Sequence, residues 1–294
     1  MTNESLPNPI NVVIYSYKGK LLKRVVDNLL QKSSKKNMIY VHVYDQSTLT
    51  KQEYFDQFDS LTYNHIFWDK IKSPCYYKQN IINNSKFSYT LLLSDNIFLN
   101  QDWDEFLLSS LPNKQSVITG KNNTILSNDG IFYLKKEEIK TEKMQQVYFA
   151  NRDLIFAHTS TLQSVNYPSY IKYYGEEEIL SLLYFSNNIK MYSCPDKFYT
   201  KEGSDTIKDL YTTFSKYHNY NEMIDLLKNQ KNKYDSIDEP LMPDVNMFLK
   251  LHQIDLESIH PLPFPMNDVE YDQDLSKFDD IDSKKFMTKI NYID

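Results

Sequence analysis

A polar turn with one carboxylate follows the most apolar strand candidate of the sequence. Residues 89–93 read YTLLL, and Ser94, Asp95 and Asn96 come directly after them. Carboxylate and amide oxygens are the ligands that hard divalent cations such as Mg²⁺ and Mn²⁺ prefer. A cation held there would act as a Lewis acid on a departing phosphate. The same three residues also make an ordinary polar turn, which is the simpler interpretation of this segment by itself.

Two adjacent carboxylates form a second candidate centre. Glu176 and Glu177 follow Gly175 at the start of a predicted helix. Carboxylates in such a place can hydrogen-bond the hydroxyls of a ligand or accept a proton from an attacking hydroxyl. Acidic residues also stabilise a helix N-terminus through the helix dipole, so a purely structural role is the alternative.

Short strands that alternate with helices are expected to position these groups. An apolar run at 11–17, helical spacing over 21–31 and a second run at 38–44 make a strand–helix–strand unit, which requires a parallel sheet. Further strands are expected at 65–68, 89–93, 116–119, 130–134 and 189–192, with a short apolar run at 153–157 and helices at 50–59, 75–86, 103–111, 176–185 and 205–230. In open α/β sheets, ligands bind beyond the carboxyl ends of the strands. We therefore expect the site where these strands end.

The chain is expected to divide after residue 203. Residues 8–203 carry the alternating pattern and are predicted to form one α/β domain. Beyond them, a helical stretch gives way to a segment interrupted by prolines, with fourteen acidic residues against five lysines from Tyr234 to the end. We expect residues 204–294 to form a helical and acidic C-terminal appendage.

Composition excludes several classes of protein. The chain has 294 residues and only five glycines, which lie too far apart for the glycine-rich loop of a dinucleotide-binding or P-loop protein. Two cysteines and the lack of a CxxC pair argue against a disulfide framework and a zinc site. The sequence shows neither a long apolar stretch nor a signal-peptide pattern, so we expect a cytoplasmic protein that does not bind a membrane.

Four segments, taken in order, resemble one family of enzymes. They are Ser16-Tyr17-Lys18 with Asp45-Gln46, then SPCYYK at 73–78, then YTLLLSDNIFLNQDWDEFL at 89–107, and last Tyr167-Pro168 with YYGEE at 173–177 and NNIKMYSCP at 187–195. In their order and spacing they resemble the GT-A GlcNAc-transferases that include the polypeptide α-N-acetylglucosaminyltransferases acting on hydroxyproline. The resemblance runs from residue 11 to about residue 195.

The resemblance implies a fold, an activity and a set of site residues. The implied fold is a GT-A-type α/β domain, and the implied reaction moves a hexosyl or pentosyl group from a UDP-sugar to an acceptor hydroxyl with retention of configuration. The implied donor-binding residues are Ser16, Tyr17, Lys18, Gln46, Cys75, Lys78, Ser94, Asp95, Asn96, Ala157 and His158. The implied acceptor-binding residues are Trp103, Tyr173, Tyr174 and Glu177, and the implied catalytic residues are Glu176, Glu177 and Asp95.

The predicted metal site departs from the family pattern in two respects. Ser94 stands where the family has its first aspartate, and residues 196–201, which follow the segment that ends at Pro195, contain no histidine. His218, in the next predicted helix, is the histidine that could take that place. Asp95 and Asn96 are then the candidate ligands for Mn²⁺ or Mg²⁺, and one carboxylate holds a metal less tightly than two. Lysines can carry part of the phosphate charge, and the candidates are Lys18, Lys78, Lys197 and Lys201.

Three alternatives remain open. A degenerate relative would bind a nucleotide sugar without turnover, which the two departures would explain. Another α/β enzyme, such as a methyltransferase or dehydrogenase, is disfavoured by the missing glycine-rich turn. The acceptor could be a hydroxymethylated DNA base, because seven basic residues and one acidic residue lie between Lys18 and Lys36. The net charge of −6 favours a protein or glycan acceptor instead.

Overall fold

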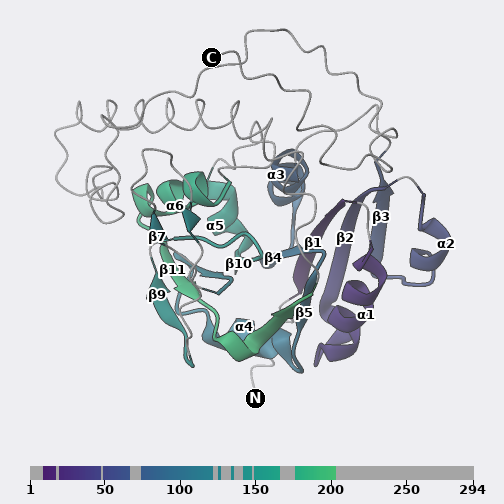
Figure 1. Ribbon diagram of the computed structural model, residues 1–294, viewed down its shortest axis with the longest axis horizontal. Coiled ribbons are helices and arrows are strands. Elements are labelled where there is room, and N and C mark those ends of the chain that lie inside the picture. The colour runs from purple at the N-terminus through teal and green to yellow at the C-terminus, as the bar shows by residue number, and fades with distance from the viewer. Residues whose placement is uncertain are drawn as a thin grey trace, which may run out of the picture.

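An eight-stranded sheet with helices on both faces forms the body of the protein in this computed structural model (Figure 1). The structure describes residues 9–17, 20–47, 49–66, 74–121, 125–126, 134–135, 142–147, 149–165 and 176–202. The strands of the sheet are β1 (Ile10–Tyr17), β2 (Ile39–Gln46), β3 (Leu61–His65), β4 (Tyr89–Ser94), β6 (Ser116–Thr119), β9 (Gln145–Val147), β10 (Leu154–His158) and β11 (Lys190–Ser193). Two further pairs are β5 (Ile97–Leu99) with β12 (Tyr199–Lys201) and β7 (Ile125–Leu126) with β8 (Leu134–Lys135).

The strand order is β3-β2-β1-β4-β10-β6-β11-β9, and the sheet is mixed but mostly parallel. β3, β2, β1 and β4 pair in parallel, as the predicted strand–helix–strand unit requires. β10 runs antiparallel to both of its neighbours, β4 and β6. β4 is an interior strand that pairs with β1 and β10, and Leu91, Leu92 and Leu93 are buried, so both of its faces are covered. The predicted α/β class, with a mostly parallel sheet between helices, is confirmed.

Helices cover the two faces of the sheet in two groups. They are α1 (Leu22–Lys32), α2 (Gln52–Phe55), α3 (Pro74–Asn84), α4 (Trp103–Ser110), α5 (Thr159–Ser164) and α6 (Glu176–Ser186). Side chains of α1, α2 and α4 pack into one core cluster, and those of α3, α5 and α6 pack into the other (Figure 1). In the part of the chain that the structure describes, every helix is too short or too polar to span a bilayer.

Two predicted elements differ from the structure or lie outside it. The strand expected at 65–68 is β3, which ends at His65 rather than beginning there. In this edge strand, Tyr63 is buried and its neighbours are partly exposed, a pattern typical of a strand with one covered face. The prediction instead followed the apolar residues after His65. Most of the strand expected at 130–134, and all of the helix expected at 205–230, lie outside the described residues, as does the predicted domain boundary.

The Trp103-Asp104 pair of the family-like segment is built into the core. Trp103 is fully buried, and its indole N–H donates to the backbone oxygen of Leu29 at 2.9 Å. Asp104 ties the start of α4 to the end of α1. Its carboxylate accepts hydrogen bonds from the hydroxyls of Ser33 and Ser34 and from the backbone N–H groups of Ser34 and Lys35, at 2.8–3.0 Å. Burial leaves Trp103 no surface for an acceptor, so the structure does not support its predicted acceptor-binding role.

We expect Asp104→Ala to lower the free energy of unfolding by about 3 kcal/mol, because several hydrogen bonds to one charged group are lost together. Urea unfolding at about pH 7 measures this. Burial works against the charge of Asp104, but the hydrogen bonds outweigh it and lower its pKa below the usual 3.8. The stabilisation is therefore present above pH ~3.8 and fades as the pH falls through the lower folded value. Glu105→Ala, at an exposed neighbour, is the control, and equal losses in the two variants would contradict the assignment.

Candidate functional site

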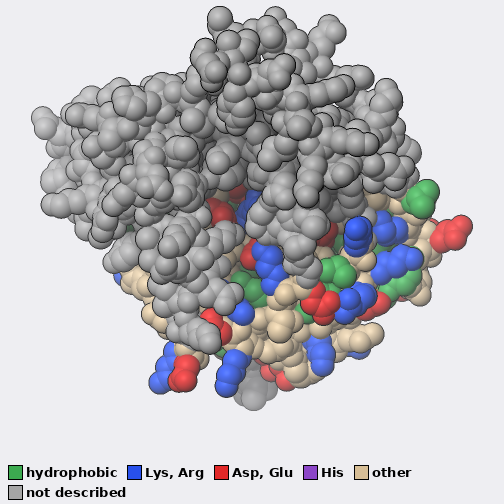
Figure 2. All heavy atoms as spheres, viewed as in Figure 1, with side chains coloured by type: hydrophobic (Ala, Val, Ile, Leu, Met, Phe, Trp, Pro, Cys, Tyr) green, Lys and Arg blue, Asp and Glu red, His purple; other side chains and the backbone are tan. Residues whose placement is uncertain are grey.

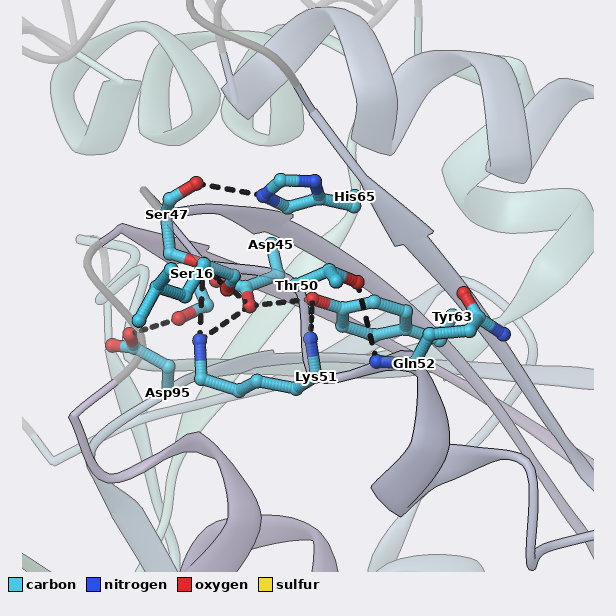
Figure 3. A network of polar contacts seen from close by, with 10 residues as sticks. Ser16, Asp45, Ser47, Thr50, Lys51, Gln52, Tyr63, His65 and Asp95 are labelled. Carbon is cyan, nitrogen blue, oxygen red and sulfur yellow. Dashed lines mark hydrogen bonds and ion pairs between the residues drawn. The ribbon is translucent and has the colours of Figure 1, made fainter.

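Three parallel strands end side by side and bring their polar residues together. Ser16 of β1 lies opposite Asp45 of β2, and Tyr15 lies opposite Ser94 of β4. The hydroxyl of Ser16 donates to Oδ2 of Asp95 at 2.7 Å (Figure 3). The structure thus unites the predicted residues Ser16, Ser94 and Asp95 at the carboxyl edge of the sheet, where ligands bind in this class of fold.

Asp45 is the most thoroughly buried carboxylate of this edge. Its Oδ2 accepts hydrogen bonds from Lys51 Nζ at 2.6 Å, from the Tyr63 hydroxyl at 2.8 Å and from the Ser47 hydroxyl at 2.9 Å (Figure 3). Its Oδ1 is buried and has no hydrogen-bond partner among the described residues. A buried carboxylate oxygen without a partner is uncommon in folded proteins and suits a ligand that brings an N–H or O–H group.

The phenol of Tyr63 stays protonated in this network. Burial raises the pKa of Tyr63 to about 12, and its hydrogen bond to Asp45 acts in the same direction, while the Lys51 backbone N–H that it accepts acts against it. His65 contacts the backbone oxygen of Ser47 at 2.7 Å and so holds the same loop. The orientation of Asp45 is therefore fixed from several sides. Asp45 belongs to one of the family-like segments of the sequence but was not among the expected site residues.

Gln46 ends β2 on the other face of the sheet. The Tyr15 hydroxyl donates to Oε1 of Gln46, and Nε2 of Gln46 is buried without a partner among the described residues. Tyr15 stacks on Tyr77 of α3 with ring centroids 5.9 Å apart, and Tyr44 lies 4.8 Å from the same ring. Gln46, which was predicted to bind the sugar donor, thus lies at the expected edge of the sheet. Its side-chain amide N–H group can donate a hydrogen bond to a ligand there.

The turn after β4 is held by the chain segments on either side of it. The Ser94 N–H donates to the Asp153 backbone oxygen at 3.0 Å, and the Glu202 N–H donates to the Asn96 backbone oxygen at 3.0 Å. Lys201 reaches both carboxylate oxygens of Asp153 at 3.0 Å. Lys201 therefore lies beside the turn as the ion-pair partner of Asp153, and its expected role toward a phosphate stays a prediction.

Glu176 and Glu177 begin α6 and are nearly buried. Glu176 is 3% exposed and forms an ion pair with Lys78 of α3, with Nζ and Oε1 2.6 Å apart. Glu177 is 9% exposed, and its Oε1 accepts the Arg152 backbone N–H at 3.0 Å. Lys78, expected to pair with phosphate, therefore has its charge neutralised by Glu176.

Arg152 joins this acidic pair to the β4 turn. Burial opposes its charge, but Glu177, Glu176 and Asp153 together outweigh burial and raise the pKa of Arg152. Arg152 precedes Asp153, whose backbone oxygen receives the Ser94 N–H, so α6 begins at the same edge of the sheet as the turn. Sequence reasoning missed Arg152, and the available signal was that it is one of only two arginines in the chain.

Other predicted residues lie elsewhere. His158 pairs with Tyr89 and Ala157 with Thr90, at the start of β4 and so at the opposite edge from Asp95. The structure does not bring either to the donor edge. Cys75 lies near Glu176 and Lys78 but is fully buried, and burial raises the pKa of its thiol well above the usual range. The Tyr17 side chain, Lys18, Tyr173 and Tyr174 lie outside the described part.

The residues at the turn fit a metal ion that is shared with a ligand. Within the described ranges, no group of three His, Cys, Asp or Glu side chains could hold a metal ion. Asp95 is the carboxylate of the turn, and Oδ1 of Asn96 is buried without a partner among the described residues. Mg²⁺ commonly takes one or two carboxylates and completes its shell with water and substrate phosphates. The turn provides oxygen ligands of that kind but not a cage made by protein alone.

We expect Lys78→Met to lower the free energy of unfolding by about 3 kcal/mol, because it removes the cation that is paired with the buried Glu176 at 2.6 Å. The double variant Lys78→Met/Glu176→Gln also removes the charge of Glu176 and should recover at least about 1 kcal/mol of that loss. Guanidinium unfolding followed by circular dichroism measures both. Lys32→Met, at an exposed lysine of α1, serves as the control. A loss in Lys78→Met no larger than in this control would show that the pair contributes nothing to stability.

Comparison with known proteins places the fold but not the family. No protein-family model and no curated protein matches the sequence. Among solved structures, S. aureus TarS 1–349 in complex with UDP-GlcNAc has a TM-score of 0.56 and 11% identity, over 84% of this chain and 71% of that chain. Another crystal structure of TarS 1–349 has a TM-score of 0.48 and 11% identity over 68% of each chain. The likeness to the complex confirms the predicted fold class.

Proposed function

We propose that this protein is a glycosyltransferase that transfers a sugar from a UDP-sugar. The UDP-sugar would bind at the carboxyl edge of the sheet. The observation that carries the proposal is the meeting of Ser16, Asp45 and Asp95 at the ends of three parallel strands. The fold in which they meet resembles that of TarS 1–349, which was solved with UDP-GlcNAc. The resemblance of the sequence segments to the GT-A GlcNAc-transferases supports the same reaction.

The nucleobase would bind beside Asp45. The buried Oδ1 of Asp45 has no partner within the described residues, while the other oxygen, Oδ2, lies 2.6 Å from the ammonium group of Lys51. Uracil presents one ring N–H, at N3, that matches a single carboxylate oxygen. This match supports a uridine nucleotide, because the buried oxygen gains its missing hydrogen bond only when the base is bound.

The diphosphate would lie over the β4 turn. Asp95, oriented by the Ser16 hydroxyl, and Asn96 would hold a divalent cation together with the phosphates. When bound, that cation supplies Lewis-acid stabilisation of the charge on the departing nucleotide. Lys201, 3.0 Å from both oxygens of Asp153, is the described lysine that we place closest to the leaving group.

The acceptor hydroxyl would lose its proton to a carboxylate at the start of α6. Glu176 already forms an ion pair with Lys78, so we assign the acceptor contact to Glu177 and a positioning role to Glu176. For retention, the hydroxyl oxygen must bond to the anomeric carbon on the same face from which UDP leaves with the electron pair of the broken bond, and the hydroxyl proton goes to Glu177. Retention rests on the sequence resemblance, and the anomeric proton coupling of the product distinguishes retention from inversion.

A second candidate function is binding of a nucleotide sugar without turnover. The observation that favours it is the buried Lys78–Glu176 pair, which removes one cation and one carboxylate from chemistry. A DNA acceptor has less support. On the face in Figure 2, Lys and Arg side chains are interspersed with carboxylates, and Arg24 forms an ion pair with Glu202 at 2.9 Å. A protein or glycan hydroxyl remains the acceptor that we propose.

Donor binding and donor turnover are tested separately. A thermal-shift screen with UDP, UDP-GlcNAc, UDP-glucose and GDP-mannose identifies the donor, and the proposal expects stabilisation by uridine compounds alone. Release of UDP from the stabilising donor is then followed with and without Mn²⁺. Stabilisation without UDP release, in the presence of protein and glycan acceptors, would favour the binding-only function. No stabilisation by any nucleotide would refute both functions.

We expect Asp95→Asn to lower turnover by about a hundredfold or more, because stabilisation of a departing charge is worth about 3–4 kcal/mol per group. The substitution keeps the shape of the side chain and an acceptor for Ser16, so unfolding should change little. Asp102→Asn is the matched control, since Asp102 is exposed before α4 and its left-handed backbone (φ 57°) suits asparagine. Unchanged turnover in Asp95→Asn would contradict the role of Asp95.

We expect Ser94→Asp to tighten binding of Mn²⁺ and to leave turnover intact or improved, because a second carboxylate joins Asp95 at the turn. Titration of Mn²⁺ in the presence of UDP, followed by electron paramagnetic resonance, measures the affinity. If a chelator leaves wild-type turnover unchanged, lysines must neutralise the diphosphate instead. In that case Lys201→Gln, rather than Asp95→Asn, would abolish activity.

A further inference from the structure

A second hollow lies at the edge of the sheet opposite Asp95. It has a volume of about 380 Å³, within the usual range for pockets that bind small molecules. Its walls come from residues 85–89, from Lys114, and from residues 158–160 with Gln163. The Thr159 N–H donates to the Ser88 backbone oxygen at 3.0 Å, which holds two of these walls together. This hollow therefore has a fixed frame and is separate from the candidate donor site.

Aromatic rings form one wall of the hollow. Tyr89 stacks on Phe156 with ring centroids 5.6 Å apart and an interplanar angle of 8°. On the hollow side, the ring of His158 lies 4.4 Å from that of Tyr89. Phe87 lines the hollow as well and packs against Tyr40 at 4.7 Å. These contacts hold the imidazole in place beside the polar wall.

The charge of the hollow is positive in a protein of net charge −6. Lys86 and Lys114 line it, and its lining contains no carboxylate. The three segments that supply the lining, residues 81–94, 106–121 and 154–165, contain no aspartate or glutamate at all. The Gln163 amide donates to backbone oxygens of Ile82 and Ser85, and the Thr159 hydroxyl pairs with that of Thr90. The hydroxyls of Ser85, Ser88 and Ser160 are therefore the remaining polar donors of the lining. Such a set of donors around two cations is suited to an anion with several acceptor oxygens.

We propose that this hollow binds the phosphate group of a small phosphorylated molecule. The ammonium groups of Lys86 and Lys114 would donate to the phosphate oxygens, serine hydroxyls would complete the shell, and the rings of Phe87 and Tyr89 would contact the organic part. The proposal does not depend on the proposed transferase activity. It assigns His158 to the wall of a separate site, in place of the donor-binding role expected from the sequence.

His158 provides a local probe of that phosphate. Burial, and then the charge of Lys114, lower the pKa of His158 below its usual 6.5. Among the residues that line the hollow, the charged or titratable neighbours of His158 are Lys86, Lys114 and Tyr89, and Ser160 contributes a hydroxyl. A bound dianion favours the protonated imidazole, so it raises the pKa of His158. In an NMR spectrum, the imidazole proton signal of His158 is the one that disappears in the variant His158→Gln.

The experiment follows the imidazole protons of the full chain by NMR while inorganic phosphate or glycerol phosphate replaces chloride at constant ionic strength. We expect a saturable rise in the pKa of His158, and weaker phosphate binding by about tenfold in both Lys114→Gln and Lys86→Gln. Lys36→Gln, at an exposed lysine outside the hollow, should bind as the wild type does.

Two results would overturn the proposal. One is a pKa of His158 that phosphate leaves unchanged at constant ionic strength. The other is a shift that is equal in Lys114→Gln, Lys86→Gln and the wild type, because it would reflect binding elsewhere. Circular dichroism of each variant checks that it folds, and a single folded lysine variant is enough to decide. Saturation by glycerol phosphate with higher affinity than inorganic phosphate would support contact of the organic part with the rings.

Discussion

The parallel pairing of β1 with β2 and β4 is the constraint on which the candidate donor site depends. The register sets Ser16 against Asp45 and Tyr15 against Ser94, so the three strands end almost level. Only then can the Ser16 hydroxyl reach Asp95 at 2.7 Å. A shift of register by one residue would turn Ser16 to the other face of the sheet, because side chains alternate along a strand.

Several carboxylates lie at one edge of the sheet and repel one another. Three of them each form an ion pair with a lysine, which reduces this repulsion. Asp45 pairs with Lys51, Asp153 with Lys201, and Glu176 with Lys78. Buried pairs of this kind add little net stability, since desolvation offsets much of their attraction. What they provide is a fixed arrangement of charge before a ligand arrives, and electrostatic stabilisation in enzymes requires such an arrangement.

The sequence predicted the positions of most strands in both halves of the sheet, but not the direction of β10. Local apolar runs and helical spacing located β1, α1, β2 and β4 to within about two residues. They carry no information on strand direction, which is decided by packing between distant segments. The family resemblance implied that Ala157 and His158 bind the donor, but β10 runs antiparallel to β4, so these two residues lie at the opposite edge of the sheet. For the same reason, Arg152, which precedes β10, belongs to the candidate site although it was not expected there.

The reversal of β10 also separates the two polar regions of the protein. Asp153 stands before the strand at the donor edge, and His158 ends it at the second hollow. Five residues of extended chain span about 17 Å, so a phosphate bound near His158 cannot touch a nucleotide bound near Asp95. Any influence of one ligand on the other must pass through the paired strands β4 and β10, whose interior side chains are fully buried. Ligands at two sites influence each other only when they shift an equilibrium between two arrangements of the protein, and we expect the buried side chains of these strands to keep one arrangement. The two sites should therefore bind their ligands independently.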